Sequence, residues 1–525
     1  MKNRSSFCKV SAGMLIFALS TPALLVGCSS PQPKTEGAVY DTGKVAEYAT
    51  PYVSYDANYN TEEYNAIDES NFKAVATSPL STFAADVDTA SYANIRRFIN
   101  SGELPPADAV RIEEMLNYFH YDYPQPNEGE PFSVTTEISA CPWNPDTKLM
   151  MVGMQAKQVD ELEKKPSNLV FLIDVSGSMD SPDKLPLVKN AFLLLCDQLK
   201  ENDTISIVTY AGSDQVVLEG AKGSDSKEIM AAIEDLEAGG STAGSEGIKT
   251  AYEIARKYFK ADGNNRVILA TDGDLNVGIT SEGELTRLIK KEKESGVFLS
   301  VLGFGTENIK DNKMEALADN GNGNYSYIDS RFEAKKVLSE ELGANFFTVA
   351  KDVKFQLEFN PKFIKGYRLI GYENRIMDDE DFKDDTKDGG EIGSGHRVTV
   401  LYEIVDKDSP MDIGSDLKYQ SSAVTESNDL LNIAVRYKEP DSETSKELNY
   451  PVTTEAIKAE MSDNMKFASA IAETGMLLRD SEFKGKSSYD SVVSILDSIP
   501  DIKNDTSKLE FLLLVKKIAS MAKEQ

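Results

Sequence analysis

A continuous apolar stretch, Leu169–Ile173, constrains the fold of this chain more than any other feature. Uninterrupted apolar residues are typical of a central parallel strand that is covered on both faces. The next segment, DVSGS from Asp174 to Ser178, places a carboxylate and two hydroxyl groups at alternate positions, with a glycine that permits a tight loop. These oxygens can converge on one hard cation. The pattern is short enough to occur by chance, so a metal site requires further ligands elsewhere in the chain.

Strands and helices alternate between Asn168 and about Lys351, which predicts a doubly wound, mostly parallel sheet with helices on both faces. The predicted strands are 169–173, 204–210, 266–271, 297–302 and 325–328. The predicted helices are 183–200, 225–237, 245–259, 281–294, 310–319 and 331–347. In such a fold, ligands bind at the carboxyl ends of the strands. The segment Asp174–Ser178 falls at this position.

The regions that flank the α/β segment show the alternation of apolar and polar residues that is typical of antiparallel strands. Such strands are predicted at 132–141 and 148–156 before the segment, and at 353–359, 367–372, 396–404 and 431–437 after it. We expect one antiparallel β-sandwich that is split by the α/β domain, although two separate sheets would show the same pattern. Helices are predicted from a cap at Asp88 or Thr89 through Phe98, at 111–119, and from 462 to the end.

Two further segments can complete the metal site. The glycine-rich loop GGSTAG offers the hydroxyl group of Thr242, and TDG offers the carboxylate of Asp272 directly after the strand predicted at 266–271. Each residue also has a simpler interpretation, Thr242 as a helix cap and Asp272 as a turn residue. The segments nevertheless occur in the right order and at strand ends of one predicted sheet, which favours a shared site.

The five oxygen-bearing residues resemble, position by position, the metal ion-dependent adhesion site of a von Willebrand factor type A domain. The matching residues are Asp174, Ser176, Ser178, Thr242 and Asp272. Segments outside this domain are similar to the flanking regions of bacterial YfbK-type lipoproteins, namely 86–119, 367–375 and 488–498. The resemblance therefore covers nearly all of the chain except its N-terminal part.

The resemblance implies a binding function. Oxygen ligands without sulfur or imidazole suit Mg²⁺, or Mn²⁺, better than zinc or copper. In the family, a partner protein supplies an Asp or Glu carboxylate to a coordination position that is otherwise left to water. The last helix of the domain, near 331–347, commonly shifts when this ligated state forms. We expect it to communicate occupancy of the metal site to the surrounding β domain.

The N-terminus has the layout of an export signal. Lys2, Arg4 and Lys9 precede an apolar run, 10–26, that leads through Gly27 to Cys28 in the sequence LVGC. This ending resembles the lipobox of bacterial lipoproteins, in which the cysteine is lipidated; the alternative is an ordinary secretory signal. We expect a lipid-anchored protein of the cell envelope. The absence of an acidic run after the cysteine favours the outer membrane, facing the periplasm.

Composition excludes several function classes. The chain has 56 Lys and Arg against 86 Asp and Glu, a formal net charge of −30, which disfavours nucleic-acid binding. Its two histidines, His120 and His396, lie outside the α/β segment, so no general base for catalysis is evident and we expect no enzyme. Cys141 and Cys196 fall in different predicted domains and are expected as buried thiols. A metal-dependent envelope hydrolase and a structural protein with a vestigial site are the alternatives.

The boundaries of the predicted regions follow from these patterns. They are a lipoprotein signal peptide (1–27), the lipidated cysteine and a disordered tether (28–75), an N-terminal helical region (76–128), the first part of the β-sandwich (129–164), the von Willebrand factor type A domain (165–350), the second part of the β-sandwich (351–450) and a C-terminal helical region (451–525). Cys28 is the predicted lipidation site.

Overall fold

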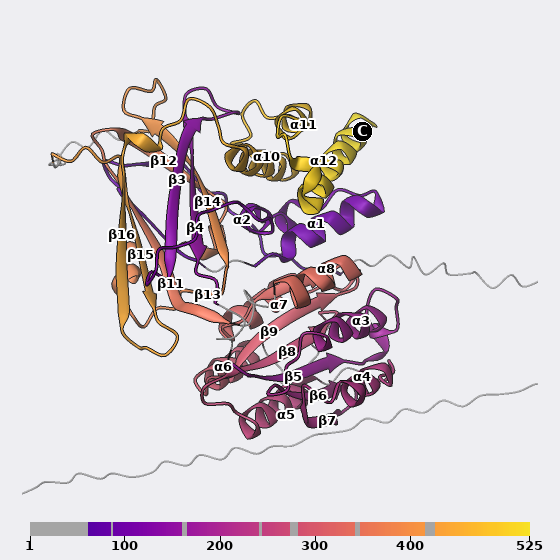
Figure 1. The fold of residues 1–525 in the computed structure, drawn as a ribbon. Coiled ribbons are helices and arrows are strands. Elements are labelled where there is room, and N and C mark those ends of the chain that lie inside the picture. Colours follow the sequence, from indigo (N-terminus) through magenta and orange to yellow (C-terminus); the bar gives the residue numbers. More distant parts are fainter. Residues whose placement is uncertain are drawn as a thin grey trace, which may run out of the picture. The chain divides into compact units, whose positions relative to one another are not determined.

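A computed structural model of the chain describes residues 61–85, 88–159, 165–240, 244–273, 282–341, 347–414 and 426–524. These residues belong to one compact unit, which spans Asn58–Gln525. Within this unit Figure 1 shows an α/β domain, two antiparallel sheets and a group of helices from both ends of the sequence.

The α/β domain is built on a six-stranded sheet with the order β10-β9-β8-β5-β6-β7. Its strands are β5 (Ser167–Asp174), β6 (Thr204–Tyr210), β7 (Asp214–Lys222), β8 (Asn264–Thr271), β9 (Phe298–Phe304) and β10 (Tyr325–Ile328). Its helices are α3 (Leu185–Cys196), α4 (Ser226–Glu234), α5 (Gly244–Lys257), α6 (Glu282–Lys293), α7 (Asp311–Asn320) and α8 (Arg331–Lys335), which continues into a π-helix, η3 (Lys336–Glu340). All pairs are parallel except β6–β7, so the predicted mostly parallel sheet is confirmed; the antiparallel edge strand β7 was not predicted.

The central strand β5 is buried along its whole length because helices cover both faces of the sheet. Successive side chains of a strand point to opposite faces, so β5 contributes to two cores. Phe171 packs with α3, where its ring stacks on Phe192 at 4.3 Å between centroids. Leu172 packs in the opposite core with Ile248 of α5. The apolar run that both cores require therefore explains why this strand shows no alternation.

The flanking strands form one split β-sandwich, as predicted. Its first sheet has the order β1-β12-β14-β4-β3, and its second sheet has the order β13-β11-β15-β16, with β2 also paired to β11. Val152 of β4 lies opposite Val400 of β14, so strands from before and after the α/β domain share one sheet. The strands are β1 (Lys73–Ala74), β2 (Leu80–Ala84), β3 (Phe132–Ala140), β4 (Lys148–Ala156), β11 (Thr348–Phe359), β12 (Ile364–Ile370), β13 (Gly390–Gly393), β14 (Arg397–Asp406), β15 (Leu431–Lys438) and β16 (Ser445–Val452).

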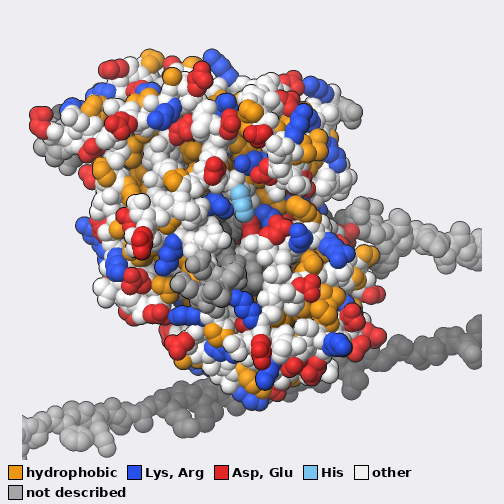
Figure 2. All heavy atoms as spheres, in the orientation of Figure 1, with side chains coloured by type: hydrophobic (Ala, Val, Ile, Leu, Met, Phe, Trp, Pro, Cys, Tyr) orange, Lys and Arg blue, Asp and Glu red, His pale blue; other side chains and the backbone are white. Residues whose placement is uncertain are grey.

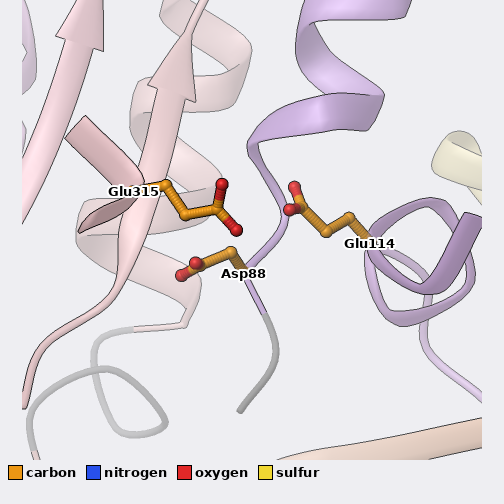
Figure 3. Close-up of side chains that lie close together, drawn as sticks. All are labelled: Asp88, Glu114 and Glu315. Atoms are coloured by element: carbon orange, nitrogen blue, oxygen red, sulfur yellow. The ribbon is translucent and has the colours of Figure 1, made fainter. Parts of the chain in front are cut away.

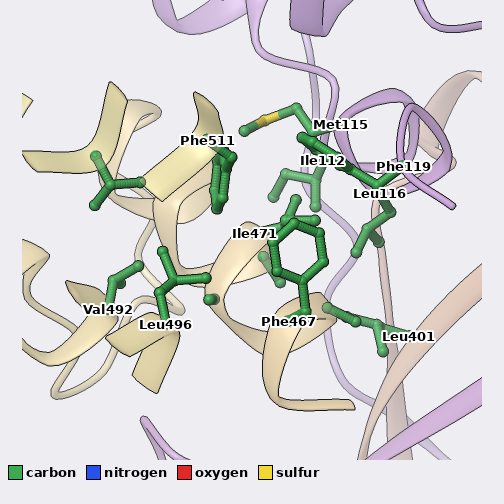
Figure 4. Packing of buried hydrophobic residues seen from close by; sticks show 14 of the residues in the cluster. Ile112, Met115, Leu116, Phe119, Leu401, Phe467, Ile471, Val492, Leu496 and Phe511 are labelled. Atoms are coloured by element: carbon green, nitrogen blue, oxygen red, sulfur yellow. The ribbon is translucent and has the colours of Figure 1, made fainter. Parts of the chain in front are cut away.

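Helices from both ends of the sequence share one core (Figure 4). They are α1 (Ala90–Ser101), α2 (Ile112–Asn117), α10 (Asp463–Leu478), α11 (Tyr489–Asp497) and α12 (Thr506–Glu524). Phe119, Phe467 and Phe511 meet edge to face, with ring centroids 5.0 to 5.7 Å apart. The N-terminal and C-terminal helical regions are therefore one structure. Among the described residues no helix has the length and apolar composition that a membrane span requires.

The start of α1 differs from the predicted cap. Thr89 occupies the N-cap position, but its side chain makes no capping hydrogen bond. The Asp88 carboxylate instead accepts a hydrogen bond from the Tyr325 N–H at 2.7 Å and forms an ion pair with Arg375 at 3.0 Å. The Asp88 side chain therefore connects the start of α1 to β10 and to Arg375.

The two cysteines are free and buried. Cys141 belongs to the core of the helices, and Cys196 ends α3 in the core of the α/β domain. This confirms the expectation of buried thiols. Burial raises the pKa of both thiols to about 12, so both are held in the neutral form.

Candidate metal centre

The structure brings together four of the five residues that the sequence predicted as metal ligands. Asp174 is the last residue of β5, and Ser176 and Ser178 follow it, the second within the short helix η2 (Gly177–Met179). Asp272 directly follows β8, which pairs with β5. Thr242 lies outside the described residues.

Hydrogen bonds arrange the loop after β5 around the Asp174 carboxylate. The Ser176 N–H donates to Asp174 Oδ1 at 2.9 Å, and the Thr271 hydroxyl donates to Asp174 Oδ2 at 3.4 Å. The hydroxyl oxygens of Ser176 and Ser178 are 3.0 Å apart. Asp174 and Asp272 are fully buried, whereas Ser178 is exposed. The cluster of oxygens therefore begins inside the domain and opens to solvent at Ser178.

The two carboxylates differ in charge environment. Burial raises the pKa of Asp174 to about 6, and the neighbouring Asp272 adds to this rise against hydrogen bonds from Ser176. Burial acts most strongly on Asp272 too, but the Lys184 ammonium group, together with hydrogen bonds to Asn308 and Ser178, outweighs it and holds the pKa of that carboxyl below its usual value. Lys184 Nζ lies 2.9 Å from Asp272 Oδ2 and 3.2 Å from Asn308 Oδ1. Asp174 is therefore the carboxylate that gains most from an added cation.

The donor set fits a hard divalent cation. The four described residues offer carboxylate and hydroxyl oxygens only, which are the ligands that Mg²⁺ and Mn²⁺ prefer over sulfur and imidazole. Both carboxylates lie at the carboxyl edge of the sheet, where ligands of doubly wound folds bind. A bound cation would supply positive charge that offsets the burial of Asp174.

The sequence did not reveal three neighbours of the site, namely Lys184, Asn308 and Thr271. Gly305 shows how closely Lys184 is packed, since a Cβ atom at this glycine would lie 2.3 Å from Lys184 Cε. The φ angle of Gly305 is 78°, which also favours glycine. Contacts between residues 88 to 124 positions apart leave no local sequence signal. Only the direct adjacency of Thr271 to Asp272 could have drawn attention to it.

A second group of carboxylates lies where the α/β domain meets α1 and α2. Asp88, Glu114 and Glu315 each offer an oxygen within 4.8 Å of the others (Figure 3). These carboxylates form ion pairs with arginines: Arg375 lies 3.0 Å from Asp88 and 3.2 Å from Glu315. Arg111 forms ion pairs with Glu114 and, at 2.5 Å, with Asp311 of α7. This arrangement favours a structural contact over a cation site.

A third arginine extends this contact to α8. Arg96 of α1 is 2 % exposed and lies 2.6 Å from both Asp329 and Glu333. It also contacts Glu510 of α12 at 3.0 Å. We call the contact that Arg96, Arg111 and Arg375 form with their carboxylate partners the arginine joint.

Comparisons with known proteins agree with this architecture. The family model of the von Willebrand factor type A domain matches residues 168–341, and the model described as von Willebrand factor matches residues 58–151. The fold and the site therefore define a protein with a von Willebrand factor type A domain, which is commonly a protein-interaction or adhesion module. The C-terminal model of the uncharacterized protein YfbK matches residues 344–521.

The uncharacterized protein YfbK of Escherichia coli is 40 % identical over 92 % of this chain and 85 % of its own length. The chain therefore belongs to the YfbK-type family. An uncharacterized protein of Synechocystis, sll0103, is 32 % identical over 35 % of this chain and 43 % of its own length. A solved structure, a von Willebrand factor type A protein from Catenulispora acidiphila, covers 67 % of this chain and 81 % of its own, with 18 % identity and a TM-score of 0.39.

Proposed function

We propose that this protein binds a partner protein in the cell envelope, as an adhesion or scaffold protein, by coordinating a carboxylate of the partner through Mg²⁺ or Mn²⁺. The residues that would hold the cation are Asp174, Ser176, Ser178, Thr242 and Asp272. The observation that carries this proposal is that two buried carboxylates and an exposed hydroxyl group lie together at the carboxyl edge of the sheet.

The charge balance of this site supports a carboxylate ligand. Two carboxylates, Asp174 and Asp272, neutralise a divalent cation without overcharging it. The open side at Ser178 leaves room for a ligand from outside the chain. An Asp or Glu side chain of a partner is a suitable ligand because hard cations prefer charged oxygen. On the face shown in Figure 2, acidic and basic side chains are interspersed, which supports a protein partner over a nucleic acid.

The positions of the histidines support binding over the alternative of a metal-dependent hydrolase. His120 and His396 line a cavity of about 360 Å³ that Ser167 and Leu169, near the amino end of β5, also line. Asp174 ends the same strand at its opposite, carboxyl end. A general base must reach the reacting atoms, and neither histidine is placed to do so.

We also propose that the chain is anchored through a lipid on Cys28 and faces the periplasm from the outer membrane. The support is the N-terminal pattern of basic residues, apolar run and LVGC. Cys28 and most of the predicted tether lie outside the described residues. The predicted tether, 28–75, extends too far, because Thr61 bonds to the backbone of Glu307 and β1 (Lys73–Ala74) pairs with β12. The residues between Cys28 and the folded unit, which begins at Asn58, would separate that unit from the membrane surface.

Calorimetric titration of the full chain with MnCl₂ and with MgCl₂ tests the cation site. We expect binding by the wild-type protein and at least a hundredfold weaker binding by Asp174→Ala, which removes one of two charged ligands. Asp180→Ala is the matched control, because Asp180 is an exposed aspartate shortly after Ser178. Equal cation affinity of Asp174→Ala and wild type would contradict the site.

Capture of proteins from a cell-envelope extract tests the partner. We expect proteins that bind the wild-type chain in Mg²⁺ to be released by a chelator and to be absent with Asp174→Ala. Proteins that stay bound under both conditions would favour the structural alternative, in which the site is vestigial. Metal-dependent turnover of a phosphoester or peptide would favour the hydrolase.

A further inference from the structure

The first residues that the structure describes, Thr61–Tyr64, lie along the loop that joins β9 to α7. We call this segment the strap. The Thr61 N–H donates a hydrogen bond to the Glu307 carbonyl oxygen at 2.7 Å, and the Glu63 N–H donates to the Ile309 carbonyl oxygen at 2.9 Å. The strap is therefore bound to this loop by backbone hydrogen bonds, which depend little on side-chain identity.

Glu62 anchors the strap. Its side chain is 3 % exposed, and its two oxygens face the Arg97 guanidinium of α1 at 3.0 Å each. The same carboxylate accepts hydrogen bonds from the Glu307 N–H at 3.1 Å and from the Tyr64 hydroxyl at 2.8 Å. A buried carboxylate in a two-pronged contact with arginine is held in one geometry. Glu62 thus connects α1 to the backbone of Glu307.

Glu307 needs this support because its backbone is strained. Its φ angle is 75°, in the left-handed region that side chains other than glycine rarely adopt. Such a conformation costs on the order of 1 kcal/mol or more and persists only where its surroundings hold it. The strap binds both polar groups of this residue, its N–H through Glu62 and its carbonyl oxygen through Thr61.

The next residue along the loop, Asn308, reaches the proposed metal centre. Its Oδ1 accepts a hydrogen bond from Lys184 Nζ at 3.2 Å, and its side chain is among the groups that lower the pKa of Asp272. The loop backbone also touches the loop after β8, since a Cβ atom at Gly273 would lie 2.6 Å from the Lys310 nitrogen. The backbone conformation of Glu307 therefore determines the position of the Asn308 side chain beside Asp272.

We propose that Glu62 is a positioning residue for the metal centre, which acts through the backbone of Glu307 to hold Asn308 against Asp272 and Lys184. This inference rests on the proposed function, because it assigns a role in holding the cation. Residues that orient metal ligands typically change metal affinity by roughly 10 to 100 fold when they are removed. Glu62 contacts no proposed metal ligand and acts only through Glu307 and Asn308, so we expect its removal to weaken metal binding by about tenfold, the lower end of this range.

Titration of the full chain with MnCl₂ separates this role from a merely structural one. Glu62→Ala removes the acceptor of the Glu307 N–H, and we expect about tenfold weaker Mn²⁺ binding. Glu62→Gln keeps an oxygen acceptor and is expected to restore most of the affinity. Glu103→Ala is the matched control, since Glu103 is an exposed glutamate outside the strap. Equal Mn²⁺ affinity of Glu62→Ala and wild type would overturn the proposal.

A second measurement needs no variant and covers the case in which Glu62→Ala does not fold. Coupling between two sites is reciprocal, so Mn²⁺ must stabilise strap docking by the factor by which the strap strengthens Mn²⁺ binding. We expect hydrogen exchange of the wild-type amides at 61–63 and 307–309 to slow by about tenfold in Mn²⁺. Unchanged exchange in a protein that binds Mn²⁺ would overturn this inference alone. Absence of Mn²⁺ binding by the wild-type chain would overturn both this inference and the proposed function.

Discussion

The proposed metal centre and the arginine joint both gather buried carboxylates, but the two regions differ in the cations that lie beside these carboxylates. In the joint, Arg96 lies 2.6 Å from both Asp329 and Glu333, and these three side chains are at most 8 % exposed. At the metal centre, one ammonium group, Lys184, serves Asp272, while Asp174 keeps a pKa raised by burial. Each carboxylate named in the joint lies within ion-pair distance of an arginine, whereas at the proposed metal centre Lys184 pairs with Asp272 and the described residues show no ion pair of Asp174.

This difference indicates what each region does. Arginine stays charged at all accessible pH values and binds carboxylates with both prongs, so the joint is a permanent contact between the α/β domain and the helices. A site with oxygen ligands and an open side suits a ligand that comes and goes. The same residue chemistry thus supports a fixed contact in one place and an exchangeable one in another.

The largest expected effect concerns the joint. Arg96→Met leaves Asp329 and Glu333 buried without their cation, and we expect the free energy of unfolding to fall by about 3–5 kcal/mol. Chemical denaturation followed by circular dichroism measures this. Arg287→Met, at an exposed site on α6, is the matched control and should change stability by less than about 0.5 kcal/mol. If Arg96→Met lowered the free energy of unfolding by less than about 1 kcal/mol, the joint would not be the permanent structural contact that distinguishes it from the metal centre.

A buried carboxylate outside the joint sharpens the comparison. Glu473 of α10 is 1 % exposed, its Oε1 has no hydrogen-bond partner among the described residues, and burial raises its pKa to about 7. Because the unfolded state loses this proton first, the native state loses stability as the pH rises from about 4.5 to 7. Glu473→Gln mimics the protonated acid and should be up to about 3 kcal/mol more stable than wild type at pH 8.

The dependence of this stability difference on pH provides the control. At pH 4.5, Glu473 is protonated in the native state and about half protonated in the unfolded state, so the advantage of Glu473→Gln should shrink to a few tenths of a kcal/mol. Denaturation curves of both proteins at pH 8 and pH 4.5 measure the difference. A constant difference between the two pH values would show that the charge of Glu473 carries no cost.

The ion pair between Lys184 and Asp272 provides a further test of the proposed metal centre. Lys184→Met removes the ammonium group beside Asp272. This ammonium group repels a divalent cation and takes up one oxygen of the Asp272 carboxylate. We expect Mg²⁺ to bind about tenfold more tightly, equal to about 1.4 kcal/mol. Calorimetric titration measures the change, with Lys189→Met on the same helix as control. Weaker Mg²⁺ binding by Lys184→Met would show that Lys184 supports the cation.

The smallest expected effect concerns communication between the two regions. Arg96 binds Glu333 in α8, and the π-helix that follows, Lys336–Glu340, is a form that often marks functional sites. If cation and ligand act through this helix, hydrogen exchange at 331–341 should change by a few fold when Mg²⁺ and a captured partner bind. No change in this segment, alongside a change at the metal loops, would show that the joint isolates α8 from the site.

Strong local patterns made much of the fold predictable. Each buried strand of the parallel sheet is a run of apolar residues between turn residues, and each covering helix has an apolar stripe, so the doubly wound fold followed from periodicity. The strands that were missed are β1, β2, β7, β13 and β16. Each pairs with one strand only, and much of β7 and β16 is exposed. β1 lies in the predicted tether and β2 in the predicted N-terminal helical region, so both regions were assigned wrongly there. Edge strands carry weaker alternation because one side and often one face meet solvent.

The sequence by itself determined the α/β domain and brought out the oxygen-bearing side chains proposed to share a site with Asp174, because both rest on residues that are close together or follow predicted strands directly. Only the tertiary structure decided what surrounds them. Lys184 beside Asp272, Arg96 beside Glu333 and Glu62 beside Glu307 join residues that are far apart in the chain. Such partners have no shared period or spacing, and they are chosen by which surfaces the folded core brings into contact.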